Sequence, residues 1–192
     1  MKKKLTWLVL SLFLSTVSVH AQTKTDEPKN IATGVIFGRN HAYMLKAPKG
    51  WVMDNQSGVS QGLHAVFYPK GSSWDKGIAV MYTNVMAKAN EKQSLEDLVD
   101  QDIRRFKQNS PNLKIEEGET LTLEKGKSAV VKKFSSDTNG NYETVAYINE
   151  SKVAVIIVLT SRSKKDYEAS LSAFRELVTS YLFITDNVTI KN

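Results

Sequence analysis

The best-spaced candidate for catalysis is the stretch Gly58-Val59-Ser60-Gln61-Gly62, which fits the pattern G-x-S-x-G. In serine hydrolases this pattern places the serine on a sharp turn from a strand into a helix, with an acid and then a histidine later in the chain. Here His64 follows on a strand-like segment, and no later histidine exists to accept the serine proton. We therefore predict a loop between strands. The alternative is a serine hydrolase that uses Ser60 and His64.

The sequence offers little to a metal or a cofactor. It contains no cysteine, which excludes thiolate zinc sites, iron–sulfur clusters and cysteine nucleophiles. His41 and His64 would bind a metal only if their strands were neighbours and Asp54 or Asp75 supplied oxygen, because a zinc site needs at least three protein ligands. Residues 34–38 lack the Lys-Ser/Thr pair of a phosphate-binding loop. We predict no catalytic residue, no metal and no cofactor.

The loop over residues 70–77 contains the residue type most typical of a protein contact. Trp74 stands there among glycine, serine and charged residues, where a rigid amphipathic ring can anchor a partner. The other interpretation is that the ring folds back over the edge of a sheet, since large aromatic side chains usually bury area. We take Trp74, Asp75 and Lys76 as the candidate partner-binding residues and leave both interpretations open.

Residues 1–21 have the layout of a secretory signal peptide. Lys2, Lys3 and Lys4 precede an apolar run over residues 5–19, and small residues at 19 and 21 suit the peptidase. The run has about 15 residues, fewer than the roughly 20 that a helix needs to cross a bilayer. We expect cleavage between Ala21 and Gln22, export to the periplasm or the medium, and no stable membrane insertion afterwards.

The basic balance of the chain does not indicate a nucleic-acid partner. The 26 basic and 20 acidic side chains give a net charge of +6, and removal of residues 1–21 lowers it to +3. Basic and acidic residues are interleaved, whereas nucleic acids require a clustered patch. The short groups at 104–107, 132–133 and 162–165 are also too small for a lipid-binding cluster. We interpret them as solvated faces and expect a protein or a small ligand of the envelope as the partner.

Segments with strand composition come in two groups, each followed by a helix. The predicted strands cover residues 41–47, 51–54, 63–68 and 78–86, and then 113–123, 127–134, 141–149 and 152–160. Their short connections favour hairpins. Residues 153–159 are apolar at every position, as in a central strand that is covered on both faces.

Helical periodicity appears after each group of strands. Apolar residues recur on one side of residues 95–106, where Ser94 and Asp97 form a capping pattern, and again over residues 167–182, where Ser163 begins the helix. We predict an α+β fold, an antiparallel β-sheet flanked by helices on both faces. The single domain spans residues 41–186, with a mobile leader at 22–40 and a C-terminal tail at 187–192.

Four stretches carry a family resemblance that spans residues 42–183. They are Pro48-Lys49-Gly50-Trp51, the Tyr68-Pro69 strand end with its Gly/Ser loop, Ser94-Leu95-Glu96-Asp97, and FRELVTSYLF at 174–183. In order and spacing they resemble the PsbP/Mog-type family. The resemblance implies an antiparallel sheet between helices and a binding or accessory role, not an enzyme. It transfers no functional residue, so we expect an exported, non-enzymatic binding or accessory protein of the cell envelope.

Overall fold

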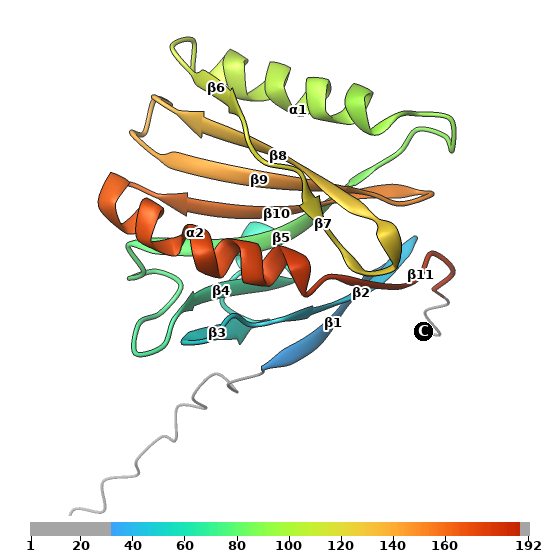
Figure 1. The fold of residues 1–192 in the computed structure, drawn as a ribbon, viewed down its shortest axis with the longest axis horizontal. Coiled ribbons are helices and arrows are strands. Elements are labelled where there is room, and N and C mark those ends of the chain that lie inside the picture. Colours follow the sequence, from blue (N-terminus) through green and yellow to red (C-terminus); the bar gives the residue numbers. More distant parts are fainter. Residues whose placement is uncertain (1–31, 189–192) are drawn as a thin grey trace, which may run out of the picture.

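The computed structural model of the chain describes residues 32–188 (Figure 1). The predicted signal peptide, most of the predicted leader and the end of the predicted tail lie outside these residues. The strands are β1 (Thr33–Gly38), β2 (His41–Lys46), β3 (Trp51–Asp54), β4 (Ala65–Pro69), β5 (Ala79–Ala87), β6 (Lys114–Glu117), β7 (Leu121–Thr122), β8 (Ser128–Ser135), β9 (Tyr142–Asn149), β10 (Val153–Ser161) and β11 (Leu182–Thr185). The helices are α1 (Leu95–Asn109) and α2 (Lys164–Thr179).

The larger sheet is antiparallel throughout. Its strands follow the order β3-β4-β5-β10-β9-β8-β6, and β7 pairs with β8 beside β6. β10 lies in the centre between β5 and β9, and its residues from Val153 to Leu159 are all buried. The predicted antiparallel α+β fold and its continuous apolar central strand are confirmed.

Alternate residues of β10 belong to two separate hydrophobic clusters. Val155, Ile157 and Leu159 pack with side chains of α2, whereas Ile156 and Val158 pack with Val99 and its neighbours on α1. This separation follows from the pleat of a strand, which points successive side chains to opposite faces. Full burial of each such aliphatic side chain contributes about 1.5–3 kcal/mol, so both helices are tied to the central strand.

The smaller sheet, of order β1-β2-β11, corrects two predictions. β1 pairs with β2 along its whole length, so residues 33–38 are not a mobile leader. The prediction rested on the polar residues 22–30 and was extended to residue 40, although residues 35–37 are apolar. In β1 only Ile36 is buried, while Val35 and Phe37 are exposed. β1 and β2 form a hairpin across the turn Arg39-Asn40, which composition alone does not show.

The end of the second predicted helix is also wrong. α2 ends at Thr179, and Leu182–Thr185 forms β11, which pairs with β2. Tyr181 lies beyond the helix and is buried, with 2% of its surface exposed. In the sequence a tyrosine at this position also fits the helical repeat, which is why the helix was predicted to continue through it. The predicted strand at 113–123 is likewise divided into β6 and β7. Between them the Gly118 N–H donates to the Val131 carbonyl at 2.8 Å. A Cβ on Gly118 would lie 2.5 Å from Cγ1 of Val131, so a side chain does not fit there.

Both predicted helix starts are confirmed. The Ser94 Oγ accepts a hydrogen bond from the Asp97 N–H at 3.0 Å, and the Asp97 carboxylate accepts one from the Ser94 N–H at 3.1 Å. The Ser163 Oγ accepts from the Asp166 N–H at 3.2 Å. These caps satisfy N–H groups that have no partner within the helix, and they fix where α2 begins above the sheet.

Candidate functional site

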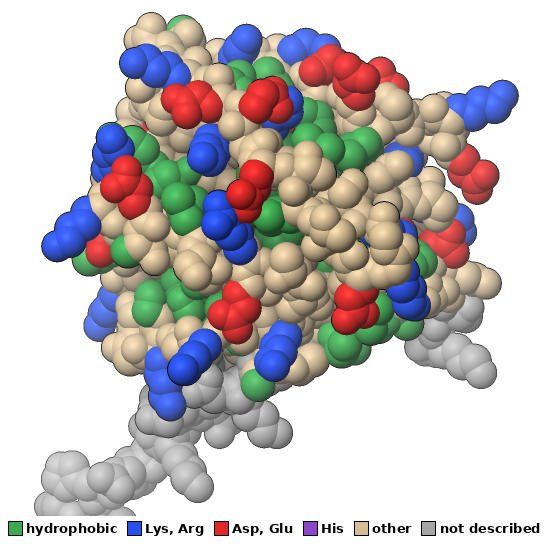
Figure 2. Space-filling model, in the orientation of Figure 1, with side chains coloured by type: hydrophobic (Ala, Val, Ile, Leu, Met, Phe, Trp, Pro, Cys, Tyr) green, Lys and Arg blue, Asp and Glu red, His purple; other side chains and the backbone are tan. Residues whose placement is uncertain are grey.

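An open cleft lies between α2 and strands β6, β8 and β9. Its larger part has a volume of about 340 Å³ and a smaller part of about 90 Å³ continues from it, with Lys133 and Leu171 lining both. We call the two parts together the α2 cleft. Figure 2 shows the face that carries α2, with hydrophobic side chains visible between basic and acidic ones.

The periodicities of β8 and α2 determine which of their side chains line the α2 cleft. Val131, Lys133 and Ser135 alternate along β8, and Val131 belongs to the cluster under α2, so Lys133 points to the same side. From the helix, Lys164, Tyr167, Glu168 and Leu171 line the larger part, at helical offsets of three, four and seven. The cleft thus has a floor from the sheet and one wall from α2.

Two tyrosines form the ordered part of the lining. The hydroxyl groups of Tyr167 and Thr144 lie 2.5 Å apart, and the rings of Tyr142 and Tyr167 have their centroids 5.9 Å apart. Burial raises the pKa of Tyr167, so the phenol stays neutral and donates or accepts hydrogen bonds only. Tyr167 therefore offers apolar surface without a charge, with the ring of Tyr142 beside it.

The charges around the cleft differ in whether they are already paired. At the narrow part, Arg175 bonds Glu119 at 2.6 Å, and at the rim Lys164 lies 3.8 Å from Glu168. Lys133 is half-buried, and within residues 32–188 it takes part in no ion pair or side-chain hydrogen bond. Its strand partner Glu116 is exposed and is not within ion-pair distance.

Sequence reasoning missed this cleft. It assigned Lys133 to a solvated face together with Lys132, because the two basic residues are adjacent in the sequence. In the structure Lys132 pairs with Glu117 at 2.5 Å on the other side of β8. The alternation of a strand was the available signal, since it sends two neighbouring lysines to opposite faces.

The predicted partner-binding residues lie elsewhere, on the loop between β4 and β5. Trp74 is half-buried and packs on the cluster that contains Leu63 and Tyr68, with its ring edge-on to Tyr82 at 6.3 Å. Its ring thus covers the sheet, as the second interpretation described. Asp75 and Lys76 are exposed. A partner contact at this loop remains a prediction.

Ser60 and His64 do not have the arrangement of a nucleophile and its base. Ser60 is exposed in a short 3-10 helix, Val59–Gln61, which leads through Gly62 toward a strand, whereas the hydrolase pattern requires a strand followed by a helix. His64 is also exposed, and in the described part of the chain no hydrogen bond joins it to Ser60.

His41, the other histidine, belongs to the small sheet. It is 6% exposed, its Nε2 has no hydrogen-bond partner among the described residues, and its ring lies 5.8 Å from that of Tyr43. Burial, and to a lesser extent the charge of His64, lowers the pKa of His41. Residues 32–188 contain no group of three or more histidines and acids that could hold a metal ion.

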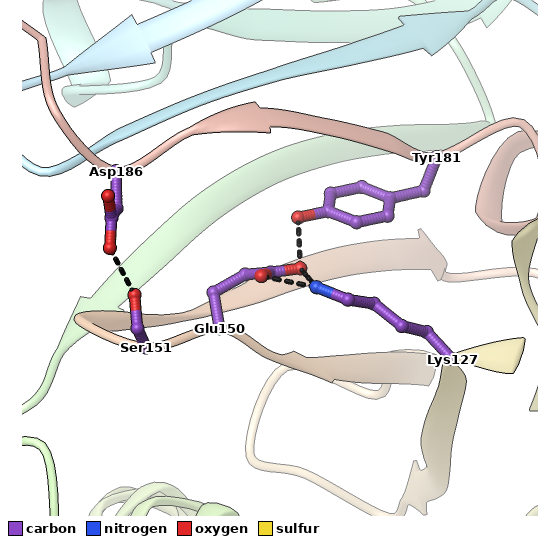
Figure 3. Close-up of polar contacts among 5 residues, drawn as sticks. All are labelled: Lys127, Glu150, Ser151, Tyr181 and Asp186. Carbon is purple, nitrogen blue, oxygen red and sulfur yellow. Dashed lines mark hydrogen bonds and ion pairs between the residues drawn. The ribbon is translucent and has the colours of Figure 1, made fainter. Parts of the chain in front are cut away.

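In a second polar cluster, at the opposite end of β8, the side chains pair with one another (Figure 3), and we call this the closed end. Glu150 is 6% exposed and accepts hydrogen bonds from the Lys127 ammonium at 2.6 Å and the Tyr181 hydroxyl at 2.9 Å. Ser151 donates to Asp186 at 2.5 Å. The sequence indicated only a short connection between the predicted strands 141–149 and 152–160, yet this turn ties β9 and β10 to the end of α2 and to β11.

Within the described part of the chain, no helix is long and apolar enough to cross a membrane. No model of a protein family matches the chain, and no curated protein sequence matches it either.

The fold has solved counterparts at low sequence identity. The solution structure of cyanobacterial PsbP (CyanoP) from Synechocystis has a TM-score of 0.52 at 15% identity, over 80% of this chain and 94% of that one. The Saccharomyces cerevisiae Ran-binding protein Mog1p has a TM-score of 0.46 at 12% identity, over 83% of this chain and 97% of that one. The similarity to CyanoP extends over most of both chains, and the protein therefore has a PsbP/Mog-like fold.

Proposed function

We propose that the chain is an exported, non-enzymatic binding or accessory protein of the cell envelope, and that the α2 cleft is its binding site. The observation that supports the proposal most is the half-buried, unpaired Lys133 in an open cleft beside two ordered tyrosines. Ligand sites typically combine apolar lining with a few convergent polar groups in this way. The resemblance of the sequence to PsbP/Mog-type proteins implies the same kind of role.

The composition of the cleft favours binding over catalysis. Its lining includes neither a histidine nor an aspartate, and within residues 32–188 no hydrogen bond joins the Ser135 hydroxyl to a glutamate or lysine of the lining. General acid–base catalysis needs a group whose pKa lies near the working pH and which reaches the substrate. The alternative, hydrolysis by Ser60 and His64, lacks the geometry described above.

Protein-observed NMR tests the binding function directly. We expect members of a library of small acids, amines and short peptides to shift resonances of Tyr142, Tyr167 and neighbouring residues. Leu171→Arg should abolish these shifts by filling the cleft. Val59→Arg is the matched control, because Val59 is 62% exposed outside the cleft. The proposal fails if no compound shifts the cleft residues, or if a bound compound is turned over.

The export part of the proposal rests on the layout of residues 1–21 and has its own test. N-terminal sequencing of the protein recovered from periplasm and medium should begin at Gln22. Recovery only from the cytoplasm with Met1 retained would contradict export.

The loop at residues 70–77 is proposed as a second contact surface of the same function. Its support is the exposure of Asp75 and Lys76 beside a ring that packing on the sheet holds in place. If this surface binds, Asp75→Ala with Lys76→Ala weakens binding of an envelope partner while leaving the shifts in the α2 cleft unchanged.

A further inference from the structure

We propose that the α2 cleft binds a small monocarboxylate with an aromatic or branched apolar body, and that Lys133 binds the carboxylate. The proposal rests on the binding function proposed above and names the class of ligand.

Lys133 is the cation that the cleft leaves available. The other two basic side chains of the lining already have acidic neighbours, Glu119 beside Arg175 at 2.6 Å and Glu168 beside Lys164 at 3.8 Å. Lys133 has no such partner within residues 32–188, although it is half-buried. A partly desolvated ammonium gains more from an anion than an exposed one does, because the lower local dielectric strengthens the attraction.

The surrounding acids limit the charge of the ligand. Glu116 is the register partner of Lys133 on β6, and Glu168 lines the same part of the cleft. Both would repel a second negative charge, so one available cation suits one negative charge. A phosphate dianion prefers several convergent donors, such as an arginine fork or a glycine-rich loop, and the lining residues include no arginine in the larger part.

The apolar lining determines the rest of the ligand. Tyr142, Tyr167 and Leu171 line the larger part of the cleft beside Lys133, and Tyr167 is held by Thr144. The volume of about 340 Å³ lies near the lower end of the range for small-molecule sites. An aromatic ring or a branched aliphatic group therefore fills the cleft while its carboxylate reaches the ammonium.

Isothermal titration of the wild-type protein with four probes that share a phenyl ring tests which charge of the ligand the cleft prefers. We expect 3-phenylpropionate to bind at least about tenfold more tightly than its methyl ester, 2-phenylethylamine and phenyl phosphate, as one charge-assisted hydrogen bond predicts. Equal binding of the ester would show an apolar site only and overturn the proposal. Tighter binding of the amine or of the phosphate would assign another ligand class and overturn it as well.

Two neighbouring lysines provide a matched pair of variants. Lys133→Met keeps the length of the side chain and should lower the affinity for 3-phenylpropionate about tenfold. Lys132→Met, on the opposite side of β8, should leave it unchanged. Equal effects of the two substitutions would overturn the role of Lys133, and the comparison of probes on wild-type protein stands even if a variant fails to fold.

The two proposals fail in different ways. If other library compounds shift the cleft resonances while 3-phenylpropionate does not bind, the monocarboxylate is wrong and the binding function stands. If no compound of any class reaches the cleft, both are wrong.

Discussion

The lysines at the two ends of β8 differ in whether they have an acidic partner. Lys127, just before the strand, meets the buried Glu150 and lies 4.8 Å over the ring of Phe183. Lys133, near the other end, faces a cleft and has no acidic partner in the described part of the chain. Ala129 and Val131, between them on the strand, are both buried in the hydrophobic cluster that includes residues of α2.

The difference separates a structural role from a binding role. Removing charges from water costs several kcal/mol per ion, and close partners offset that cost. At the Lys127 end the chain supplies those partners itself, because Glu150 in the turn between β9 and β10 accepts hydrogen bonds from both Lys127 and Tyr181. Around Lys133 it leaves the place open, so a ligand can supply the partner. We therefore expect substitutions at the closed end to change stability and substitutions at the open end to change binding.

Glu150→Ala should produce the largest effect. It leaves Lys127 without its acid and the Tyr181 hydroxyl without its acceptor, and the free energy of unfolding should fall by about 3 kcal/mol, as for a broken buried ion pair. Urea denaturation followed by circular dichroism measures the loss.

The matched control is Glu117→Ala, which removes the partner of Lys132. The Glu117 side chain is 74% exposed, so this substitution should change the free energy of unfolding by less than about 1 kcal/mol. Similar losses in the two variants would mean that the Lys127 end is no more structural than a surface pair.

Measuring the free energy of unfolding against pH tests the closed end through His41. The ring of His41 packs on that of Tyr43, which in turn packs on Tyr181. The rings of these two tyrosines lie 5.5 Å apart. Burial lowers the pKa of His41 below its usual value of 6.5, so the unfolded chain binds the proton more readily. The free energy of unfolding should fall as the pH drops below about 6.5, by at most about 1.4 kcal/mol per pH unit from this group.

Replacement of the histidine tests the assignment. His41→Phe keeps an aromatic ring and removes the unpartnered Nε2, and it should reduce the slope of stability against pH between 7.5 and 5. His64→Gln, at an exposed position, should leave most of the slope in place. The reverse outcome would move the pH dependence to the loop before β4.

The sequence predicted correctly those helices and strands whose own residues show a clear periodicity or a clear boundary. The limits of β3 and the first residue of α1 were predicted correctly, since Trp51–Asp54 is bounded by glycine and polar residues and Ser94 caps the helix. β1 was missed because one buried residue, Ile36, gives no period, and its strand forms through pairing with β2. β11 was missed because Tyr181 fits a helix equally well.

The sites were less predictable than the fold because they join distant residues. Thr144 and Tyr167 meet across 23 positions, and Lys127 and Glu150 also across 23. No local pattern records which turn lies beside which strand end. Trp74 is an isolated aromatic residue in a polar loop, and its ring packs against the cluster that contains Leu63 and Tyr68. The strand alternation around Lys133 was the one local signal of the cleft, and adjacency to Lys132 obscured it.

Lys133→Met should have the smallest effect on stability of the substitutions considered. The substitution breaks no ion pair within residues 32–188, because the Lys133 ammonium has no partner there. A methionine of similar length retains contact with the apolar lining. Its free energy of unfolding in urea should stay within about 0.5 kcal/mol of the wild type. A loss as large as that of Glu150→Ala would mean that Lys133 supports the fold, and the two ends of β8 would then be alike. An unchanged or slightly higher stability together with weaker carboxylate binding would show that this end of the strand carries a half-buried charge for a ligand and not for folding.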